Sequence, residues 1–121
     1  MTDQPVVVWC EIPVTDMQKA CDFYAEVFGF TMTIDDTGPN PMATLGTNME
    51  TVAGHLYPGK PAVGNGPTVH LAVPGALSEA VDRCKLAGGT IVSPPIEIPP
   101  GKFVYATDPD GNSLGLFEPK G

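Results

Sequence analysis

Two side chains, Glu11 and His70, could carry out proton-transfer chemistry. Glu11 stands inside an apolar run, where an unpaired buried carboxylate is costly, so it must be paired, exposed or functional. His70 lies in a second apolar run, where a lone imidazole is either a hydrogen-bonded core residue or a functional group. Together they could transfer protons without a metal, with the carboxylate as base and the histidine as acid. The sequence does not establish that they touch.

Three further residues could line a ligand pocket. Trp9 shares a strand face with Glu11, because alternate residues of a strand point the same way. Its ring could stack on a flat ligand or belong to the core. Tyr105 and Thr107 share a face of a later strand, and simple sheet packing is the competing interpretation for both.

The elements that position these residues follow the order strand, helix and further strands. This order occurs twice along the chain. The first copy opens with a β-branched and aromatic strand over 5–12. An apolar stripe from Met17 to Phe28 predicts an amphipathic helix, with Thr15 and Gln18 as a capping box and Gly29 as its end. Shorter strands are expected near 30–35, 42–46 and 51–57.

The second copy follows a glycine- and proline-rich linker at about 59–67. A strand is expected over 68–73, then a helical stripe from Leu77 to Ala87 that ends at Gly88 and Gly89, and a strand over 90–92. The proline-rich stretch 94–100 is predicted to be a rigid loop with little capacity for a strand ladder.

The chain ends in a predicted hairpin. Its strands are expected over 102–107 and 112–118, and the Asp-Pro-Asp-Gly sequence at 108–111 is a strong turn signal. We interpret Asp108 and Gly111 as turn formers, not catalysts.

Composition restricts the classes of function. Six Lys and Arg against fourteen Asp and Glu give a net charge of −8, which argues against nucleic acid as a partner. The acidity would favour a cationic ligand only if the acids converged on a cavity; the alternative is an acidic surface. The three cysteines form no C-x-x-C pair, and Cys21 and Cys84 fall on the helical stripes as core residues. With no apolar run of about 18 residues and no secretory pattern, no membrane association is expected and the default location is cytoplasmic.

Five short strings together resemble the vicinal oxygen chelate superfamily, which includes glyoxalase I, extradiol dioxygenases and the fosfomycin- and bleomycin-resistance proteins. The strings are Val14-Thr15-Asp16, Phe23-Tyr24 with Phe28-Gly29-Phe30, His70-Leu71-Ala72-Val73, Ala87-Gly88-Gly89 and Asp108-Pro109-Asp110-Gly111-Asn112. The resemblance covers essentially the whole chain. It implies an α+β fold of two tandem βαβββ modules, at about 5–58 and 68–119 of a single domain spanning 1–121. Their curved mixed sheets are expected to form a cup, commonly completed in a homodimer.

The resemblance also locates the metal ligands of metal-using members. Their positions fall on Trp9, Gly54, His70 and Gly115, so only the histidine is a donor. Glu11 could add a carboxylate beside His70, but two donors make a poor site, since about three are needed. His55 and Glu118 are expected to face away from the cup, being offset by one and three residues from Gly54 and Gly115. No cofactor is therefore expected, and a divalent metal has weak support.

Two functions remain open. The first is a binding protein that holds a small organic ligand, neutral or cationic, in the cup without the usual metal, as the likeness to bleomycin-resistance proteins implies. The second is a lyase, isomerase or dioxygenase-type enzyme acting on a small oxygenated substrate, with Glu11 and His70 in proton transfer or metal binding. A regulatory module with an unused cup is a third alternative. The Gly-Leu-Phe-Glu ending resembles a branch described only as glyoxalase-related.

Overall fold

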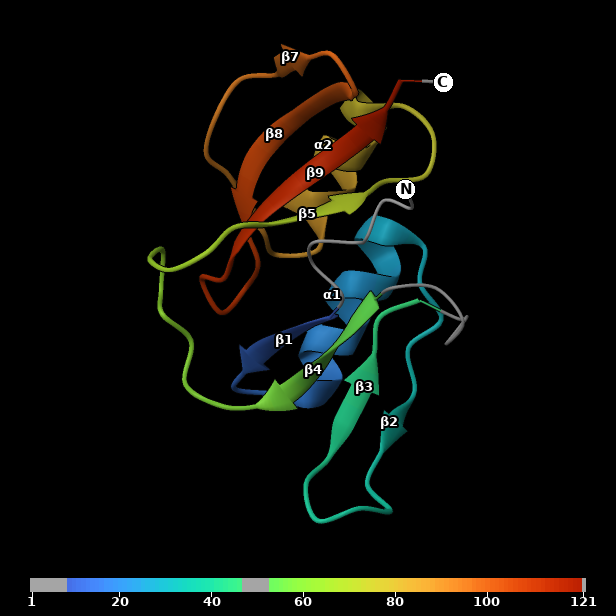
Figure 1. Ribbon diagram of the computed structural model, residues 1–121, viewed down its shortest axis with the longest axis vertical. Helices are drawn as coiled ribbons and strands as arrows, with labels where there is room; N and C mark the ends of the chain where they lie inside the picture. Colours follow the sequence, from blue (N-terminus) through green and yellow to red (C-terminus); the bar gives the residue numbers. More distant parts are fainter. Residues whose placement is uncertain (1–8, 47–52, 121) are drawn as a thin grey trace, which may run out of the picture.

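The computed structural model describes residues 9–46 and 53–120, which form two mixed sheets and two helices. The first sheet has the strand order β1-β4-β3-β2, and the second has β5-β9-β8-β6 with β7 paired to β8 (Figure 1). The strands of the first sheet are Trp9–Val14, Ile34–Asp35, Met42–Thr44 and Ala53–Pro58, numbered β1 to β4 along the chain. Those of the second, β5 to β9, are Val69–Ala72, Thr90–Ile91, Ile96–Ile98, Gly101–Thr107 and Ser113–Pro119.

Both sheets follow one pairing rule. The first strand of each module runs parallel to the last, β1 beside β4 and β5 beside β9, and the other pairs are antiparallel. A parallel pair needs a crossover, which each module supplies through a helix. The predicted α+β fold of two βαβββ modules with curved mixed sheets is therefore confirmed.

Helix α1, Met17–Phe28, forms where the apolar stripe predicts it, and its buried residues include Phe23, Tyr24 and Val27. Gly29 ends it in the left-handed conformation, at φ 74°. The predicted capping box is wrong by one residue. The N-cap is Asp16, whose side chain accepts a hydrogen bond from the backbone N–H of Lys19, because a carboxylate at this position reaches the free helical N–H groups.

Helix α2 spans Leu77–Leu86, and its N-cap residue is Ala76, whose methyl side chain cannot accept a hydrogen bond. The Glu118 carboxylate takes that part from strand β9, accepting the backbone N–H of Leu77 at 2.7 Å. Glu118 thus points toward the helix side of its sheet, as its offset from Gly115 predicts. Gly88, at φ 101°, follows the last turn as expected.

The proline-rich stretch contains a strand, contrary to the prediction. Ile96–Ile98, the β7 strand, pairs antiparallel with β8, with Ile96 opposite Phe103 and Ile98 opposite Gly101. The prolines of this stretch flank the strand on both sides, so the three residues between them keep the N–H groups that a ladder needs.

The hairpin β8–β9 and its turn are as predicted, and the turn also joins the two modules. Asp108 holds the turn by accepting the backbone N–H groups of Asp110 and Asn112. The Asn112 amide then donates to the carbonyl of Pro13 at 2.8 Å, and the Thr15 hydroxyl donates to the Asp110 carboxylate. The second module is thereby tied to the end of β1 in the first.

The core lies between the helices and one face of each sheet, and Figure 1 places α1 behind β1 and β4 and α2 behind β8 and β9. The fully buried side chains include Val14, Leu56, Leu114 and Leu116 from the strands. Neither helix of the described residues covers the opposite face of its sheet, which leaves these faces available for a site. Within the described residues no helix is long and apolar enough to span a membrane.

Candidate functional site

The open face of the first sheet carries Trp9, Glu11, His55 and Tyr57. In the register of β1 with β4, Glu11 lies opposite His55, and residues opposite each other in a ladder share a face. Trp9 lies opposite Ala53, and Gly54 lies opposite Cys10 on the helix side. The inference that His55 faces away from Trp9 is therefore wrong, because it depended on an alignment of the two modules that was one residue out of register.

A hydrogen bond from Trp9 determines which ring nitrogen of His55 carries the proton. The Trp9 indole Nε1–H donates to His55 Nδ1 at 2.9 Å. Because an indole N–H can only donate, Nδ1 must be the unprotonated nitrogen of the imidazole, and the neutral ring carries its proton on Nε2. Strand alternation was the only sequence signal for the pairing of Trp9 with His55. It predicts the pair only when the register of β1 with β4 is known.

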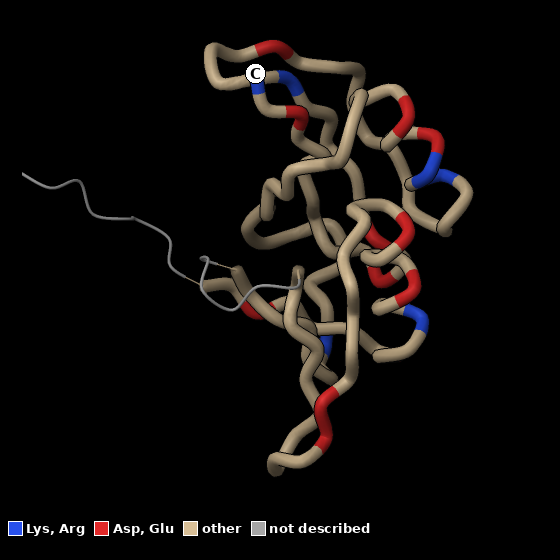
Figure 2. Tube along the Cα trace, turned by 90° about the vertical axis from the view of Figure 1, so that its right-hand side faces the viewer, with Lys and Arg blue, Asp and Glu red and all other residues tan. Residues whose placement is uncertain are grey.

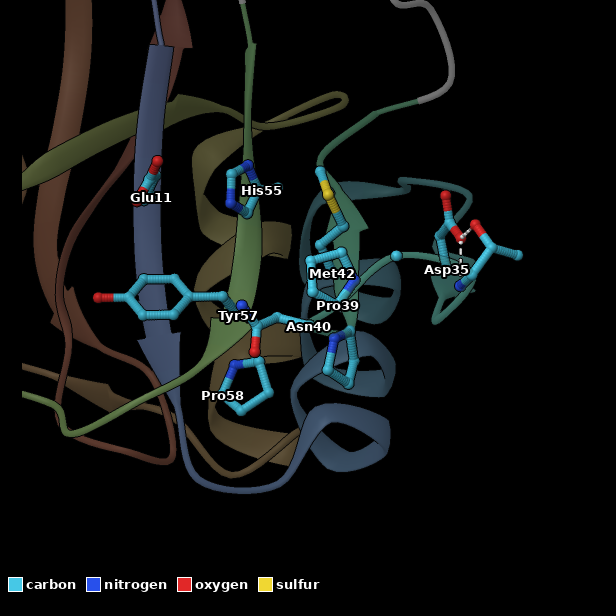
Figure 3. Close-up of a pocket in the computed structure, with 11 residues that line it drawn as sticks. Glu11, Asp35, Pro39, Asn40, Met42, His55, Tyr57 and Pro58 are labelled. Carbon is cyan, nitrogen blue, oxygen red and sulfur yellow. Dashed lines mark hydrogen bonds between the residues drawn. The ribbon is translucent and has the colours of Figure 1, made fainter.

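A groove of about 590 Å³ opens beside these residues. Its floor includes Glu11, His55 and Tyr57, and its wall is the connection from Thr37 to Pro41 between β2 and β3. Figure 3 shows Glu11 and His55 on neighbouring strands, with the Tyr57 ring extending across β1. We call this the first-sheet groove. Asp35 also lines it, and two hydrogen bonds from Thr37 lower the pKa of that carboxyl, so it is anionic.

His70 lies on the open face of the second sheet among aromatic rings. Its ring centroid is 4.8 Å from Phe103, 5.8 Å from Tyr105 and 6.1 Å from Phe117, all in edge-on contacts. The ring also covers Gly115, where a Cβ atom would lie 2.0 Å from Nδ1. Although one side of His70 is exposed, its burial lowers the pKa of the imidazole below its usual 6.5.

His70 also lines a cleft of about 580 Å³ between the modules. We call it the intermodule cleft; its lining is mostly apolar and consists of Cys10, Phe30, Leu45, Gly46, Ala53, Pro67, Thr68, Val69, His70 and Leu71. The sequence analysis missed most of these residues, because the cleft depends on how the two modules pack. That packing is not encoded in the pattern of either module.

Tyr105 and Thr107 share the open face of β8, as alternation predicts. Tyr105 is 38% exposed and contacts His70 and Phe103, so it belongs to the aromatic cluster. Thr107 lies further along, opposite Ser113 and Thr90, where it is half-buried between strands. Their role in ligand binding stays a prediction.

The structure places Glu11 and His70 in different hollows. Glu11 lines the first-sheet groove and His70 the intermodule cleft, and these share no lining residue. Proton transfer by this pair stays a prediction. The donors also do not fit a family-type metal site: the neighbours of the His70 ring are the aromatic rings of Phe103 and Phe117, and the described residues contain no group of three His, Cys, Asp or Glu that could hold an ion.

The acidic residues are distributed over both modules, and Figure 2 shows them along the length of the molecule. They do not gather at one hollow among the described residues. Their distribution therefore favours the interpretation of an acidic surface over that of a cavity built for a highly charged cation.

Paired βαβββ modules with helices on one side and open sheet faces on the other define the glyoxalase fold class. The sequence also matches the profile of the Glyoxalase/Bleomycin resistance protein/Dioxygenase superfamily over residues 6–116. The chain belongs to this superfamily.

Solved structures with the same fold cover almost the whole chain. A member of the superfamily from Sphaerobacter thermophilus is 26% identical, with a TM-score of 0.68 over 95% of this chain and 98% of that one. TnmS3 from Streptomyces sp. CB03234, described as an antibiotic binding protein, is 24% identical, with a TM-score of 0.67 over 99% of this chain and 100% of that one. At this identity the second likeness establishes the fold alone.

Two curated relatives, each named "Putative glyoxylase CFP32", come from Mycobacterium bovis and Mycobacterium tuberculosis. Each is 29% identical over 120 residues, which cover 91% of this chain and 44% of the relative. The chain thus spans less than half the length of these relatives.

Proposed function

We propose that the protein binds a small organic ligand in the intermodule cleft and does so without a resident metal. The observation that carries this is the cleft itself, about 580 Å³ with mostly apolar lining and a single imidazole, His70. Small-molecule sites are typically hollows of about 300–1,000 Å³ with apolar walls and a few polar groups that orient the ligand.

The state of His70 supports this function. With a lowered pKa, the imidazole is neutral near pH 7 and can both donate and accept a hydrogen bond. The rings of Phe103 and Phe117 restrict its orientation, so little conformational entropy is lost when a ligand engages it. The similar fold of TnmS3, an antibiotic binding protein, agrees with a binding role.

The proposed function includes a homodimer. Val92, Ile98 and Tyr105 are large apolar side chains that are 61%, 39% and 38% exposed. Ile98 lies in β7 and Tyr105 in β8, and Val92 follows β6 directly and donates its backbone N–H to the carbonyl of Tyr105. An exposed apolar surface on one sheet is typical of an interaction site. Light scattering on the purified chain tests the dimer, and a mass equal to one chain contradicts it.

The binding proposal is tested by NMR titration with neutral and cationic ring fragments. We expect saturable shifts centred on Ala53, His70 and Leu71. The variant Ala53→Phe places a ring in the cleft and should abolish those shifts. Ser78→Phe, which adds the same ring at an exposed position on α2, is the matched control and should leave them intact.

Two outcomes would contradict the proposal. If no fragment shifts the cleft resonances, or if Ala53→Phe leaves them unchanged, the cleft is not the binding site. Native mass spectrometry during Zn²⁺ titration tests the second part: a stoichiometric, tightly held ion overturns the metal-free character of the site.

A further inference from the structure

We propose that the first-sheet groove binds the amide edge of a planar ring, in which an N–H and a C=O are adjacent, as in a lactam or a cyclic imide. Glu11 accepts from the ligand N–H, and His55 donates to the ligand C=O. The proposal goes beyond the intermodule cleft, because the two hollows share no lining residue.

The donor is defined by the Trp9 contact. Since His55 Nδ1 accepts the indole N–H at 2.9 Å, the proton of the neutral ring is on Nε2. No described residue accepts a hydrogen bond from Nε2, and the His55 side chain lines the groove. The groove therefore holds a hydrogen-bond donor for which the described residues supply no acceptor.

The acceptor stands beside it. Glu11 is the register partner of His55 in the parallel β1–β4 pair, so their side chains leave the same face of neighbouring strands, about 4.8 Å apart. Glu11 is exposed, and its carboxylate forms no hydrogen bond or ion pair with the described residues. An acceptor beside a donor can bind adjacent atoms of opposite character on a ring edge, the pattern by which side chains recognise a base edge.

The rest of the groove suits a flat ring of neutral or positive charge. Tyr57 extends across β1 beside the pair, while Pro39 and Met42 add apolar surface (Figure 3). The carboxylates of Glu11 and Asp35 disfavour phosphates and carboxylates, because like charges repel at this range. The groove is thus selective by charge as well as by hydrogen bonding.

Trp9 acts here as a positioning residue. Without its N–H, His55 could carry its proton on either nitrogen, and the donor would face the groove for only part of the time. Trp9→Phe keeps an aromatic ring and removes this N–H together with the pyrrole part of the indole. Its effect should therefore appear in the tautomer of His55, which a purely structural role would not change.

The first measurement is the ¹⁵N NMR spectrum of the His55 ring at neutral pH. We expect a protonated Nε2 and an unprotonated Nδ1 in the wild type, and a mixture of tautomers in Trp9→Phe. A wild-type ring with its proton on Nδ1, or an unchanged tautomer in a folded Trp9→Phe, overturns the positioning role. Should Trp9→Phe fail to fold, the wild-type spectrum still decides which nitrogen is the donor.

The second measurement compares two probes, 2-pyridone and N-methyl-2-pyridone, which differ only in the ring N–H. We expect 2-pyridone to bind about tenfold more tightly, as judged by shifts at Glu11 and His55, because one hydrogen bond to a carboxylate is lost on methylation. Glu11→Gln should weaken binding of 2-pyridone, and Glu97→Gln, an exposed carboxylate on β7, is the control for net charge.

Equal affinity for the two probes, or no shifts in the groove, contradicts the amide-edge proposal. The same spectra report the intermodule cleft through His70 and Leu71, which lie outside the groove. Failure of this inference is therefore distinguishable from failure of the proposed function.

Discussion

The hydroxyl of Tyr24 donates a 2.7 Å hydrogen bond to Oδ2 of Asp108, joining helix α1 of the first module to the β8–β9 turn of the second. Both groups are buried, with Tyr24 at 0% and Asp108 at 4% exposure. Burial and the carboxylate raise the pKa of Tyr24 well above its usual value, so the phenol remains a donor throughout the physiological range. Asp108 is therefore more than a turn former, because it also couples the modules.

Removing that donor should destabilise the fold. We expect Tyr24→Phe to lower the free energy of unfolding by about 2 kcal/mol, since a hydrogen bond to a buried charged group is lost. Urea unfolding measures the change. The control is Tyr57→Phe, which removes a hydroxyl from the half-exposed first-sheet groove and should cost less than about 0.5 kcal/mol. Equal costs for the two variants would mean that Tyr24 does not couple the modules.

The three free thiols should differ in reactivity in the native state. Burial and the nearby Asp108 raise the pKa of Cys84 to about 11, and its side chain is 0% exposed. Cys10 is half-buried, and burial alone raises its pKa. Because the thiolate is the reactive form, alkylation at about pH 8 should modify Cys10 first and Cys84 last, as followed by peptide mass spectrometry. In urea the order should disappear; native labelling of Cys84 as fast as Cys10 would contradict its burial.

The helices were predictable because their signals are local. The stripe from Met17 to Phe28 and the glycine at 29 depend only on residues within one element, and both are confirmed. The cap was misassigned by one residue because Thr15 and Asp16 are both good capping residues. In the structure the Thr15 hydroxyl is bonded to Asp110 in the other module, a long-range partner that no local pattern reveals.

The site was less predictable because it depends on strand register. Alternation correctly put Trp9 and Glu11 on one face, but the partner of Glu11 is set by the pairing of β1 with β4. An error of one residue in aligning the modules exchanged the faces of Gly54 and His55. The β7 strand was missed for a related reason: its three residues lie between prolines, and only pairing with β8 reveals them as a strand.

The Glu118 carboxylate should stabilise the start of helix α2. It accepts the backbone N–H of Leu77 at 2.7 Å, where the helix has no cap of its own, and a negative charge there also favours the helix dipole. We expect Glu118→Ala to cost about 1 kcal/mol of unfolding free energy in urea titrations. Lys102→Ala removes only the 4.0 Å ion pair with Glu118 and should be nearly neutral. If the lysine variant costs as much, the ion pair and not the cap accounts for the effect.

His70 should make stability depend on pH in the weakly acidic range. Its pKa in the folded protein is lowered by burial, so as the pH falls below the usual 6.5 the unfolded chain takes up the proton first. The contribution of the neutral ring is therefore fully present above that pH and is lost as the pH falls through the lowered pKa. We expect the urea midpoint to fall between about pH 7.5 and about pH 5, and to fall less in His70→Gln. Equal pH dependence in His70→Gln and wild type would mean that the packing of His70 against Phe103 and Phe117 does not disfavour its charged form.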